Sequence, residues 1–359
     1  MAPRFHDLKV IGIERQTPDA VAIAFEVPAD HAETFAFVPG QYLTLATDID
    51  GQEARRSYSI CSAPGEPHLR VGVKQVADGR FSTFVNEQLA VGDTIRVMPP
   101  QGRFTALKGE RHDYLLFAAG SGITPMLSIA RTVLAHEKGS TITLVYGNRS
   151  TETIMFLEEL NDLKDRYMGR FTLIHLLSRE AQDVDLFNGR VDGARVTALA
   201  AGGLIAPAEA DGVFLCGPGE MIDDVSVALA TMGVARDRIR FERFTPSGEA
   251  PAPRKASKAV REAVQEGVAI EVVLDGVRRS FAMQDADGTV LDAAHKAGIE
   301  LPYSCAGGMC CTCRCRVVEG ASEMAVNFSL EPWEVEAGFT LACQTRPTAH
   351  RLVLDFDAA

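Results

Sequence analysis

Five of the eight cysteines fall within eleven residues, and their spacing constrains this chain more than any other feature. Cys305, Cys310 and Cys313 follow the pattern C-x4-C-x2-C, and Cys343 supplies a fourth thiol further along the chain. This spacing is that of the plant-type 2Fe-2S cluster, in which four thiolates bind two irons. No other three of the clustered cysteines satisfy both intervals, so we expect these four residues to be the iron ligands.

A structural zinc site is the competing interpretation of the cysteine cluster. Zinc favours two separate C-x2-C pairs, whereas the chain has one such pair, Cys310 and Cys313. The small residues at 306–308 would let backbone amides approach the sulfurs of an iron cluster. We therefore favour the 2Fe-2S cluster, and we expect Cys311 and Cys315 to be buried apolar residues rather than ligands.

Length and charge limit the remaining possibilities. A chain of 359 residues is expected to form two or three domains. Its net charge of -12 argues against nucleic acid and anionic membranes as partners. The N-terminus lacks the pattern of a secretory signal, and no apolar run is long enough to span a membrane. We therefore expect a cytoplasmic protein, in which a reducing environment keeps thiols available for iron.

Residues 1–108 have the pattern of an antiparallel β-barrel. Short runs rich in β-forming residues are separated by Pro and Gly turns. These runs are LKVIGIERQ, VAIAFEVP, QYLTLAT, RRSYSICS, LRVGVKQV and TIRVMPP. One helical insert is expected over residues 82–88.

The rest of the chain changes pattern twice. Residues 109–244 alternate strands with helices, which predicts a doubly wound parallel sheet in an α/β domain. Residues 245–267 are rich in Pro, Gly, Ala and charged residues, the composition of a linker. Residues 268–359 begin with a hairpin around Asp275-Gly276, and a short helix, TVLDAAHKAG, precedes the cysteines. We expect this last segment to be a separate α+β domain.

A glycine-rich turn follows the first strand of the α/β segment. The residues from Gly120 to Pro125 read GSGITP and lie between a buried strand and a helix. At such a position backbone amides and a helix N-terminus can bind a pyrophosphate. A plain tight turn is the alternative.

Four motifs together resemble those of the ferredoxin–NADP reductase superfamily. RSYS at 56–59 and GRFS at 79–82 are similar to its two flavin motifs. GSGITP at 120–125 and CGP at 216–218 are similar to its two nicotinamide motifs, in the same order. The cofactor-binding residues implied by this resemblance are Arg56, Ser57, Tyr58, Ser59, Gly79, Phe81, Ser82, Gly120, Gly122, Thr124, Pro125, Cys216, Gly217 and Pro218.

The resemblance implies particular roles at the flavin. Arg56 would pair with the flavin pyrophosphate, Tyr58 would stack on the flavin ring, and Ser59 would hydrogen-bond near N5. The helix end around Ser82 would bind a second phosphate, which favours FAD over FMN. Glu242 is considered as a proton relay and left unassigned.

The resemblance also implies where the nicotinamide dinucleotide binds. Thr124 and Cys216 would flank the nicotinamide, and we count Tyr58, Ser59 and Cys216 as catalytic. Ser178 and Arg179 end a strand where this superfamily recognises the 2′-phosphate, and Arg149 ends the preceding strand. These arginines favour NADPH. NADH remains the alternative, because plant-type members of the superfamily carry a Tyr just downstream and this chain does not.

Within the superfamily, the chain most resembles the reductase subunits of phenylacetyl-CoA epoxidase complexes. The resemblance extends over nearly all residues, and NFSLEP and the closing DFDA favour this narrower assignment. It implies a reductase with a C-terminal β-grasp-like ferredoxin domain. Electrons would pass from NADPH through FAD and the 2Fe-2S cluster to a di-iron oxygenase component. A reductase of a Rieske dioxygenase or ketosteroid hydroxylase, and a redox-sensing module, are the alternatives.

The segment around the single tryptophan suggests a docking face for the oxygenase. Residues 268–359 contain thirteen acidic and seven basic residues, a difference of -6. Glu331, Glu334 and Glu336 surround Trp333, the only tryptophan. We expect an acidic patch that attracts a basic oxygenase surface. The alternative is a solvated helix face with Trp333 in the core.

Overall fold

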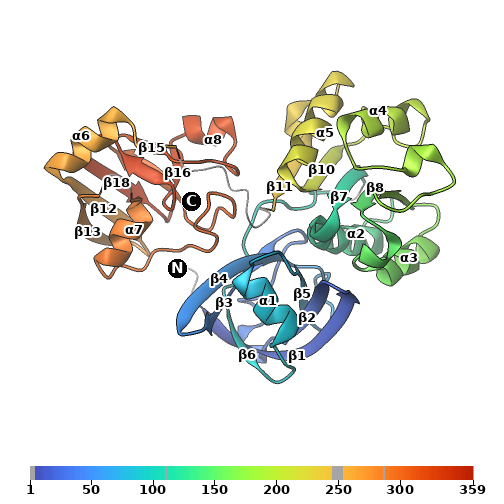
Figure 1. Ribbon diagram of the computed structural model, residues 1–359, viewed down its shortest axis with the longest axis horizontal. Helices are drawn as coiled ribbons and strands as arrows, with labels where there is room; N and C mark the ends of the chain where they lie inside the picture. Colours follow the sequence, from blue (N-terminus) through green and yellow to red (C-terminus); the bar gives the residue numbers. More distant parts are fainter. Residues whose placement is uncertain (1–4, 110, 245–253, 286–287, 359) are drawn as a thin grey trace. The chain divides into compact units, whose positions relative to one another are not determined.

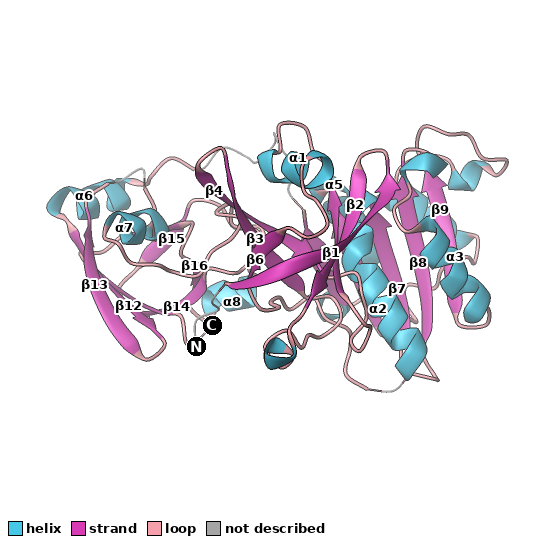
Figure 2. Cartoon of the chain, turned by 90° about the horizontal axis from the view of Figure 1, so that it is seen from below, coloured by secondary structure: helices cyan, strands magenta, loops and turns pink. Residues whose placement is uncertain are grey.

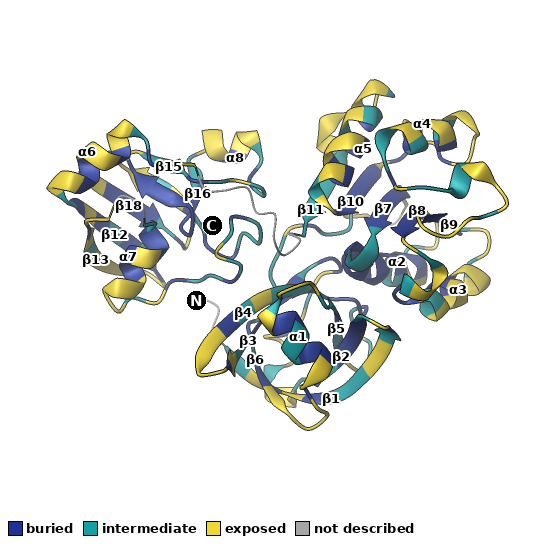
Figure 3. Ribbon diagram, viewed as in Figure 1, coloured by how far each residue is buried: buried dark blue, intermediate teal, exposed yellow. Residues whose placement is uncertain are grey.

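The computed structural model describes residues 5–109, 111–244, 254–285 and 288–358. The chain forms two compact units (Figure 1). The larger holds the described residues of 6–54 and 58–248, and the smaller holds those of 249–359 with short pieces at 1–5 and 55–57. Each unit has its own buried core, shown in dark blue in Figure 3.

The N-terminal part of the larger unit is a six-stranded sheet with the order β4-β3-β6-β1-β2-β5. Its strands are β1 (His6–Thr17), β2 (Ala20–Glu26), β3 (Tyr42–Ile49), β4 (Gln52–Ser59), β5 (Leu69–Lys74) and β6 (Thr94–Val97). All six predicted strands are present, and the pairings among β1, β2, β3, β5 and β6 are antiparallel.

An isolated antiparallel bridge between Ile60 and Val71 joins the two ends of this sheet. This contact brings the first and last strands of the sheet together, so that the sheet curls around the apolar faces of its strands. The interior contains Ile23, Phe25 and Leu43, all fully buried. Helix α1 (Arg80–Glu87) is the expected insert and places Phe81 against this core.

The second part of the larger unit is a five-stranded sheet, β11-β10-β7-β8-β9, in which every pairing is parallel. The strands are β7 (Asp113–Ala119), β8 (Thr141–Asn148), β9 (Phe171–Leu177), β10 (Gly212–Gly217) and β11 (Ile239–Arg243). The helices are α2 (Ile123–His136), α3 (Leu157–Arg166), α4 (Gly193–Ala201) and α5 (Gly219–Thr231). Figure 2 shows the strands with their helices.

Two hydrophobic clusters cover the two faces of this parallel sheet. Successive residues of β7 alternate between them, because side chains on a strand point to opposite faces: Leu116 joins the cluster of α2 and α3, and Leu115 joins that of α4 and α5. Helix α4 was not predicted. Its sequence, GARVTALAA, is dominated by small residues, and its buried side is limited to Val196 and Leu199.

The smaller unit contains a five-stranded sheet with the order β13-β12-β18-β14-β16 and a two-stranded sheet of β15 and β17. The strands are β12 (Val268–Leu274), β13 (Val277–Met283), β14 (Arg314–Glu319), β15 (Ser322–Met324), β16 (Phe339–Leu341), β17 (Thr345–Pro347) and β18 (Arg351–Asp355). The helices are α6 (Lys258–Glu266), α7 (Val290–Lys296) and α8 (Pro332–Glu336). The predicted hairpin is present, and Asp275 and Gly276 at its turn both have positive φ, as a type I′ turn requires.

Part of the segment with linker composition is a helix. Residues 245–253 lie outside the described residues, but α6 occupies 258–266. Ser257 caps the helix by accepting a hydrogen bond from the Val260 amide at 3.2 Å. Val260, Ala263 and Val264 are buried in the core of the smaller unit, so the charged residues that suggested a linker form the outer face of an amphipathic helix.

None of the helices that the structure describes has the length and apolar character needed to cross a membrane.

Candidate cofactor sites

The cysteine loop of the smaller unit directs backbone amides at the thiols. The amides of Gly307 and Cys310 donate to Cys305 Sγ at 3.3 and 3.4 Å, and the Cys305 amide donates to Cys310 Sγ at 3.5 Å. This tight loop requires left-handed backbone at Ala306 and Gly308. Amides around the sulfurs are the surroundings that stabilise thiolate ligands of an iron–sulfur cluster.

The four candidate ligands lie as two pairs of thiols. Cys305 interacts with Cys310, and Cys313 with Cys343. The hydrogen bond between the Cys305 and Cys310 sulfurs, with the amides around them, lowers the pKa of Cys305 against the effect of burial. Two pairs of thiols can supply two ligands to each iron of a 2Fe-2S cluster. The arrangement therefore suits a 2Fe-2S cluster better than a site for a single zinc ion.

The two remaining cysteines of the cluster, Cys311 and Cys315, differ in how far they are buried. Cys315 is fully buried, and burial raises the pKa of its thiol, as expected for an apolar core residue. Cys311 is half-buried and has a left-handed backbone, so the expectation that it is buried is wrong in degree. The tight turn after Cys310 keeps this residue near the surface.

The two flavin motifs lie on neighbouring parts of the barrel. Tyr58 on β4 is half-buried and its ring packs against Phe81 of α1 at 5.7 Å between centroids. Ser82 accepts a hydrogen bond from the Val76 amide at 3.2 Å and donates to the Gly79 carbonyl at 3.0 Å. A side chain at Gly79 would collide with Ser82 and Val76. The glycine therefore allows the tight turn that starts α1.

Other residues of these two motifs differ in how far they are exposed. Arg56 and Arg80 are exposed. Arg80 donates to the Ile49 carbonyl at 2.6 Å, so its guanidinium braces the end of β3. Ser57 precedes Tyr58 and is half-buried.

Ser59 connects the barrel with the parallel sheet. Its hydroxyl donates to Glu242 Oε2 at 2.9 Å, although 183 residues separate the two. Glu242 lies on β11 directly beside Cys216 of β10. Burial raises the pKa of Glu242 to about 7, and burial also raises the pKa of the Cys216 thiol. The site thus contains a carboxyl group that changes its protonation state near neutral pH.

The glycine-rich turn is held against the neighbouring strand. A side chain at Gly122 would lie 2.1 Å from the Cys216 carbonyl oxygen, so glycine is required for this approach. Gly120 has a φ of +54°, and its carbonyl accepts a hydrogen bond from the Tyr146 hydroxyl at 2.9 Å. Thr124 and Pro125 are buried at the start of α2. The glycine-rich turn and the CGP motif therefore meet at the carboxyl ends of β7 and β10.

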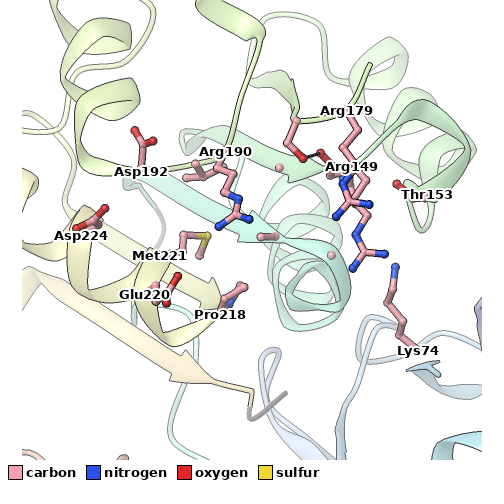
Figure 4. Close-up of a pocket in the computed structure, with 16 residues that line it drawn as sticks. Lys74, Arg149, Thr153, Arg179, Arg190, Asp192, Pro218, Glu220, Met221 and Asp224 are labelled. Atoms are coloured by element: carbon pink, nitrogen blue, oxygen red, sulfur yellow. Dashed lines mark hydrogen bonds between the residues drawn. The ribbon is translucent and has the colours of Figure 1, made fainter. Parts of the chain in front are cut away.

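A cavity of about 530 Å³ opens at this edge of the parallel sheet, where ligands of α/β domains commonly bind (Figure 4). Predicted residues that line it are Gly120, Arg149, Ser178, Arg179 and Pro218. Gly122, Thr124, Pro125, Cys216 and Gly217 lie in the adjoining turns but are not among its lining residues.

Several lining residues were missed by the sequence analysis. Lys74, Thr153, Arg190, Asp192, Glu220, Met221 and Asp224 are among them. Figure 4 shows the charged ends of Lys74, Arg149 and Arg179 gathered on one side of the cavity. In this view Arg190 lies between them and the carboxylates. None of these residues belongs to a motif, so no local signal marked them.

The predicted acidic patch around Trp333 needs correction. Glu334 is 1% exposed and forms an ion pair with Arg314 at 3.0 Å, so it does not contribute to a surface patch. Trp333 is 59% exposed, so the alternative that placed it in the core is also wrong. Glu336 is exposed and Glu331 half-buried.

Family models match three segments of the chain. The oxidoreductase FAD-binding domain matches residues 7–106, and the oxidoreductase NAD-binding domain matches 116–227. The 2Fe-2S iron-sulfur cluster binding domain matches 272–348. The chain therefore has domains for FAD, a nicotinamide dinucleotide and a 2Fe-2S cluster.

Known proteins resemble the chain over its whole length. It is 43% identical over 358 residues to a subunit of the 1,2-phenylacetyl-CoA epoxidase of Escherichia coli (strain K12), covering 99% of this chain and 98% of that protein. It is 37% identical to the ferredoxin reductase component of 3-ketosteroid-9-alpha-monooxygenase of Rhodococcus rhodochrous, covering 97% and 96%. The solved structure of phthalate dioxygenase reductase has the same fold, with a TM-score of 0.61, 23% identity and 98% coverage of both chains.

Proposed function

The chain belongs to the family of flavin and iron–sulfur reductases that serve multicomponent oxygenases, and on that premise we propose that it supplies electrons to a di-iron oxygenase component of the phenylacetyl-CoA epoxidase type. The observation that carries the proposal is the 43% identity to the epoxidase subunit over 99% of the chain. The competing assignment is a reductase for a ketosteroid hydroxylase or Rieske dioxygenase, supported by the 37% identity to the ketosteroid reductase component.

We assign one step of the electron path to each segment. Residues 1–108 form the flavin barrel, 109–244 the doubly wound nicotinamide domain and 268–359 a β-grasp-like ferredoxin domain. Helix α6 belongs to the last of these, because its apolar side is buried in the core of the smaller unit. Holding the cluster on the same chain as the flavin raises its effective concentration at the flavin. We also propose a cytoplasmic location, because none of the eight cysteines forms a disulfide bond and an oxidising compartment would endanger the four proposed iron ligands.

The barrel would hold FAD with the residues of its two motifs. FAD, when bound, accepts a hydride from the nicotinamide and releases electrons singly to the cluster. Tyr58 offers a half-buried aromatic face for the flavin ring, and exposed Arg56 offers a cation for the pyrophosphate. The amides at the start of α1, exposed by the Gly79 turn, would bind the second phosphate.

Ser59 and Glu242 would bind and release a proton beside the flavin. The Ser59 hydroxyl donates to Glu242 when the carboxyl group is ionised, and it can turn to donate elsewhere when the carboxyl group carries the proton. A pKa of about 7 allows both states near neutral pH.

We propose NADPH as the electron donor because the cavity contains uncompensated cations. Arg149, Arg179 and Arg190 line it, and their guanidinium groups form no ion pair with any residue that the structure describes. Arg149 and Arg179 lie side by side, since the Arg179 amide donates to the Arg149 carbonyl at 2.8 Å. A guanidinium pair at the end of β8 and β9 suits a phosphate dianion such as the 2′-phosphate.

Reconstituted turnover tests the proposed acceptor. The full chain, carrying FAD and its cluster, is mixed with NADPH, phenylacetyl-CoA and the oxygenase component of a phenylacetyl-CoA epoxidase. We expect epoxide formation coupled to NADPH oxidation. The same assay with a ketosteroid hydroxylase oxygenase component should give a rate at least about tenfold lower, because mismatched partners lose binding energy at the interface.

The Cys343→Ser variant is the control for the electron path. It should keep NADPH-dependent bleaching of the flavin but lose transfer to the oxygenase, because one iron loses a ligand. Equal or faster turnover with the ketosteroid component would contradict the proposed acceptor. Full turnover by the Cys343→Ser variant would instead contradict the route through the cluster.

A further inference from the structure

The helix α8 presents apolar side chains to solvent beside the iron-binding loop. It spans five residues, and Trp333 and Val335 on it are 59% and 42% exposed. A tryptophan can bury more apolar area than any other side chain. Because Trp333 is exposed, the folded chain lacks the stabilisation that its burial would give. Exposed apolar groups of this kind mark surfaces that contact a partner.

Buried electrostatic contacts hold this short helix in place. A single helical turn is unstable by itself. Glu334 accepts a hydrogen bond from the Glu331 amide at 3.1 Å and pairs with Arg314 Nη2 at 3.0 Å. Arg314 in turn lies over the ring of Phe339, 3.5 Å from its centroid. Glu334 is thus turned inward, while the neighbouring Trp333 is turned outward.

The same segment is attached to the cysteine loop. The Phe328 amide and the Ser329 hydroxyl both donate to the Gly308 carbonyl, at 3.2 and 3.1 Å. Asn327 closes the turn between them and α8 by accepting from the Leu330 amide at 2.8 Å. Gly308 lies between the proposed ligands Cys305 and Cys310. A protein bound at α8 would therefore be close to the cluster, as electron transfer requires.

The charge around this surface indicates the chemistry of the partner. Glu331 and Glu336 stand on either side of Trp333 and Val335 in the sequence, and the segment 268–359 carries a net charge of -6 from thirteen acidic and seven basic residues. An apolar centre with an acidic rim complements an apolar pocket rimmed by Lys or Arg.

We infer that Trp333 and Val335, flanked by Glu331 and Glu336, form the surface on which the oxygenase component docks to receive electrons, with Trp333 as its central anchor. This inference rests on the proposed function, because it requires an oxygenase acceptor. Arg314 and Glu334 are positioning residues that hold the helix in its docking orientation.

The test compares Trp333→Ala with a matched control, Val277→Ala. Val277 is 49% exposed and lies on β13, at the opposite edge of the same sheet from β16, which follows α8. Turnover with NADPH is measured against the concentration of the phenylacetyl-CoA epoxidase oxygenase component. Trp333→Ala should raise the half-saturating concentration about tenfold or more, as the loss of an interface anchor does. Val277→Ala should leave it within about twofold, as a residue outside the interface does.

Two further measurements identify what covers the surface. Stopped-flow bleaching of the cluster by NADPH, without oxygenase, should have the same rate in Trp333→Ala and wild type. Glu336→Gln should weaken the dependence of oxygenase affinity on ionic strength, because one rim charge is removed. An unchanged dependence would overturn the basic rim assigned to the partner.

The outcomes separate the docking surface from the proposed function. Equal half-saturation for Trp333→Ala and wild type would overturn the docking surface. Cluster bleaching slowed as much as turnover would show that the chain's own flavin domain uses the surface instead. A wild-type dimer that Trp333→Ala dissociates would show that a second copy covers it. Failure of the wild-type chain to reduce this oxygenase would overturn the proposed acceptor itself.

Discussion

At the scale of single residues, the charged groups of the cavity are the ones on which the proposed preference for NADPH rests. Arg149, Arg179 and Arg190 come from three different segments, and the first two end adjacent parallel strands. Lys74 lies on the same side as Arg149 and Arg179, but it is already paired with Asp19 at 3.3 Å. The arginines therefore have more to gain from an added phosphate than the lysine does.

We expect Arg179→Ala to raise the KM for NADPH about tenfold and to leave the KM for NADH within about twofold, because a charge-assisted hydrogen bond to phosphate contributes about 1.5 to 3 kcal/mol. Steady-state reduction of ferricyanide measures both constants. Arg166→Ala, at an exposed position at the end of α3, is the control and should change neither. An equal rise for both dinucleotides would place Arg179 at a phosphate that the two share.

At the scale of elements, α8 shows how a buried ion pair decides the orientation of a short helix. The helix starts with Pro332 at its first position and carries the capping pair of Glu331 and Glu334. These signals predict that a helix forms but not which side faces the core. The Arg314 guanidinium, 11% exposed, selects the side that carries Glu334.

Removing the carboxylate should destabilise the smaller unit. We expect Glu334→Ala to lower the free energy of unfolding by about 3 kcal/mol, because it removes the buried carboxylate that pairs with the buried Arg314 guanidinium. Thermal unfolding followed by the fluorescence of Trp333, the only tryptophan, reports on this unit. Glu336→Ala, at an exposed position on the same helix, should unfold like wild type. Equal stability of the two variants would show that the ion pair contributes nothing.

At the scale of the whole molecule, the barrel and the parallel sheet are joined within one compact unit. Arg70 on β5 pairs with Glu159 of α3 at 2.9 Å, and Ser128 of α2 donates to the Ser62 carbonyl at 2.7 Å. Gly72 lets β5 approach α2, because a side chain there would lie 2.6 Å from the Thr124 methyl group. Such contacts let the flavin and nicotinamide sites keep a common geometry.

The burial of Glu242 makes the stability of this unit depend on pH, and the hydrogen bond from Ser59 opposes this effect. Burial raises the pKa of Glu242 to about 7, so the folded chain holds this proton where the unfolded chain has lost it. The stabilisation is complete below the unfolded value of 4.5 and is lost as pH rises through about 7. At pH 8 the Glu242 carboxylate is charged and buried, which lowers the stability of the folded unit.

We expect Glu242→Gln to remove this dependence. The variant should match wild type near pH 5 and exceed its stability at pH 8 by about 1 to 2 kcal/mol, because the amide is neutral and can still accept from Ser59. Thermal unfolding of the full chain between these pH values measures the difference. Glu209→Gln, at an exposed position, is the control. A variant less stable than wild type at pH 8 would contradict the assigned protonation.

The sequence by itself determined the features that depend on local intervals. Strand and helix periods, the Asp275-Gly276 turn and the C-x4-C-x2-C spacing are set by residues close together in the chain, so they could be predicted. Each of the four cofactor motifs is likewise a short run of neighbouring residues, and their order along the chain predicted the family. Helix α6 was concealed by a linker-like composition, because its apolar face is short.

Only the tertiary structure decided which distant residues meet. It brought Cys343 to Cys313, Ser59 to Glu242 and Arg190 to the cavity. It also buried Glu334 and exposed Trp333, the reverse of what residue type alone predicts. The physical reason is that the burial of a side chain depends on the partners that face it, and those partners come from segments that no local pattern connects.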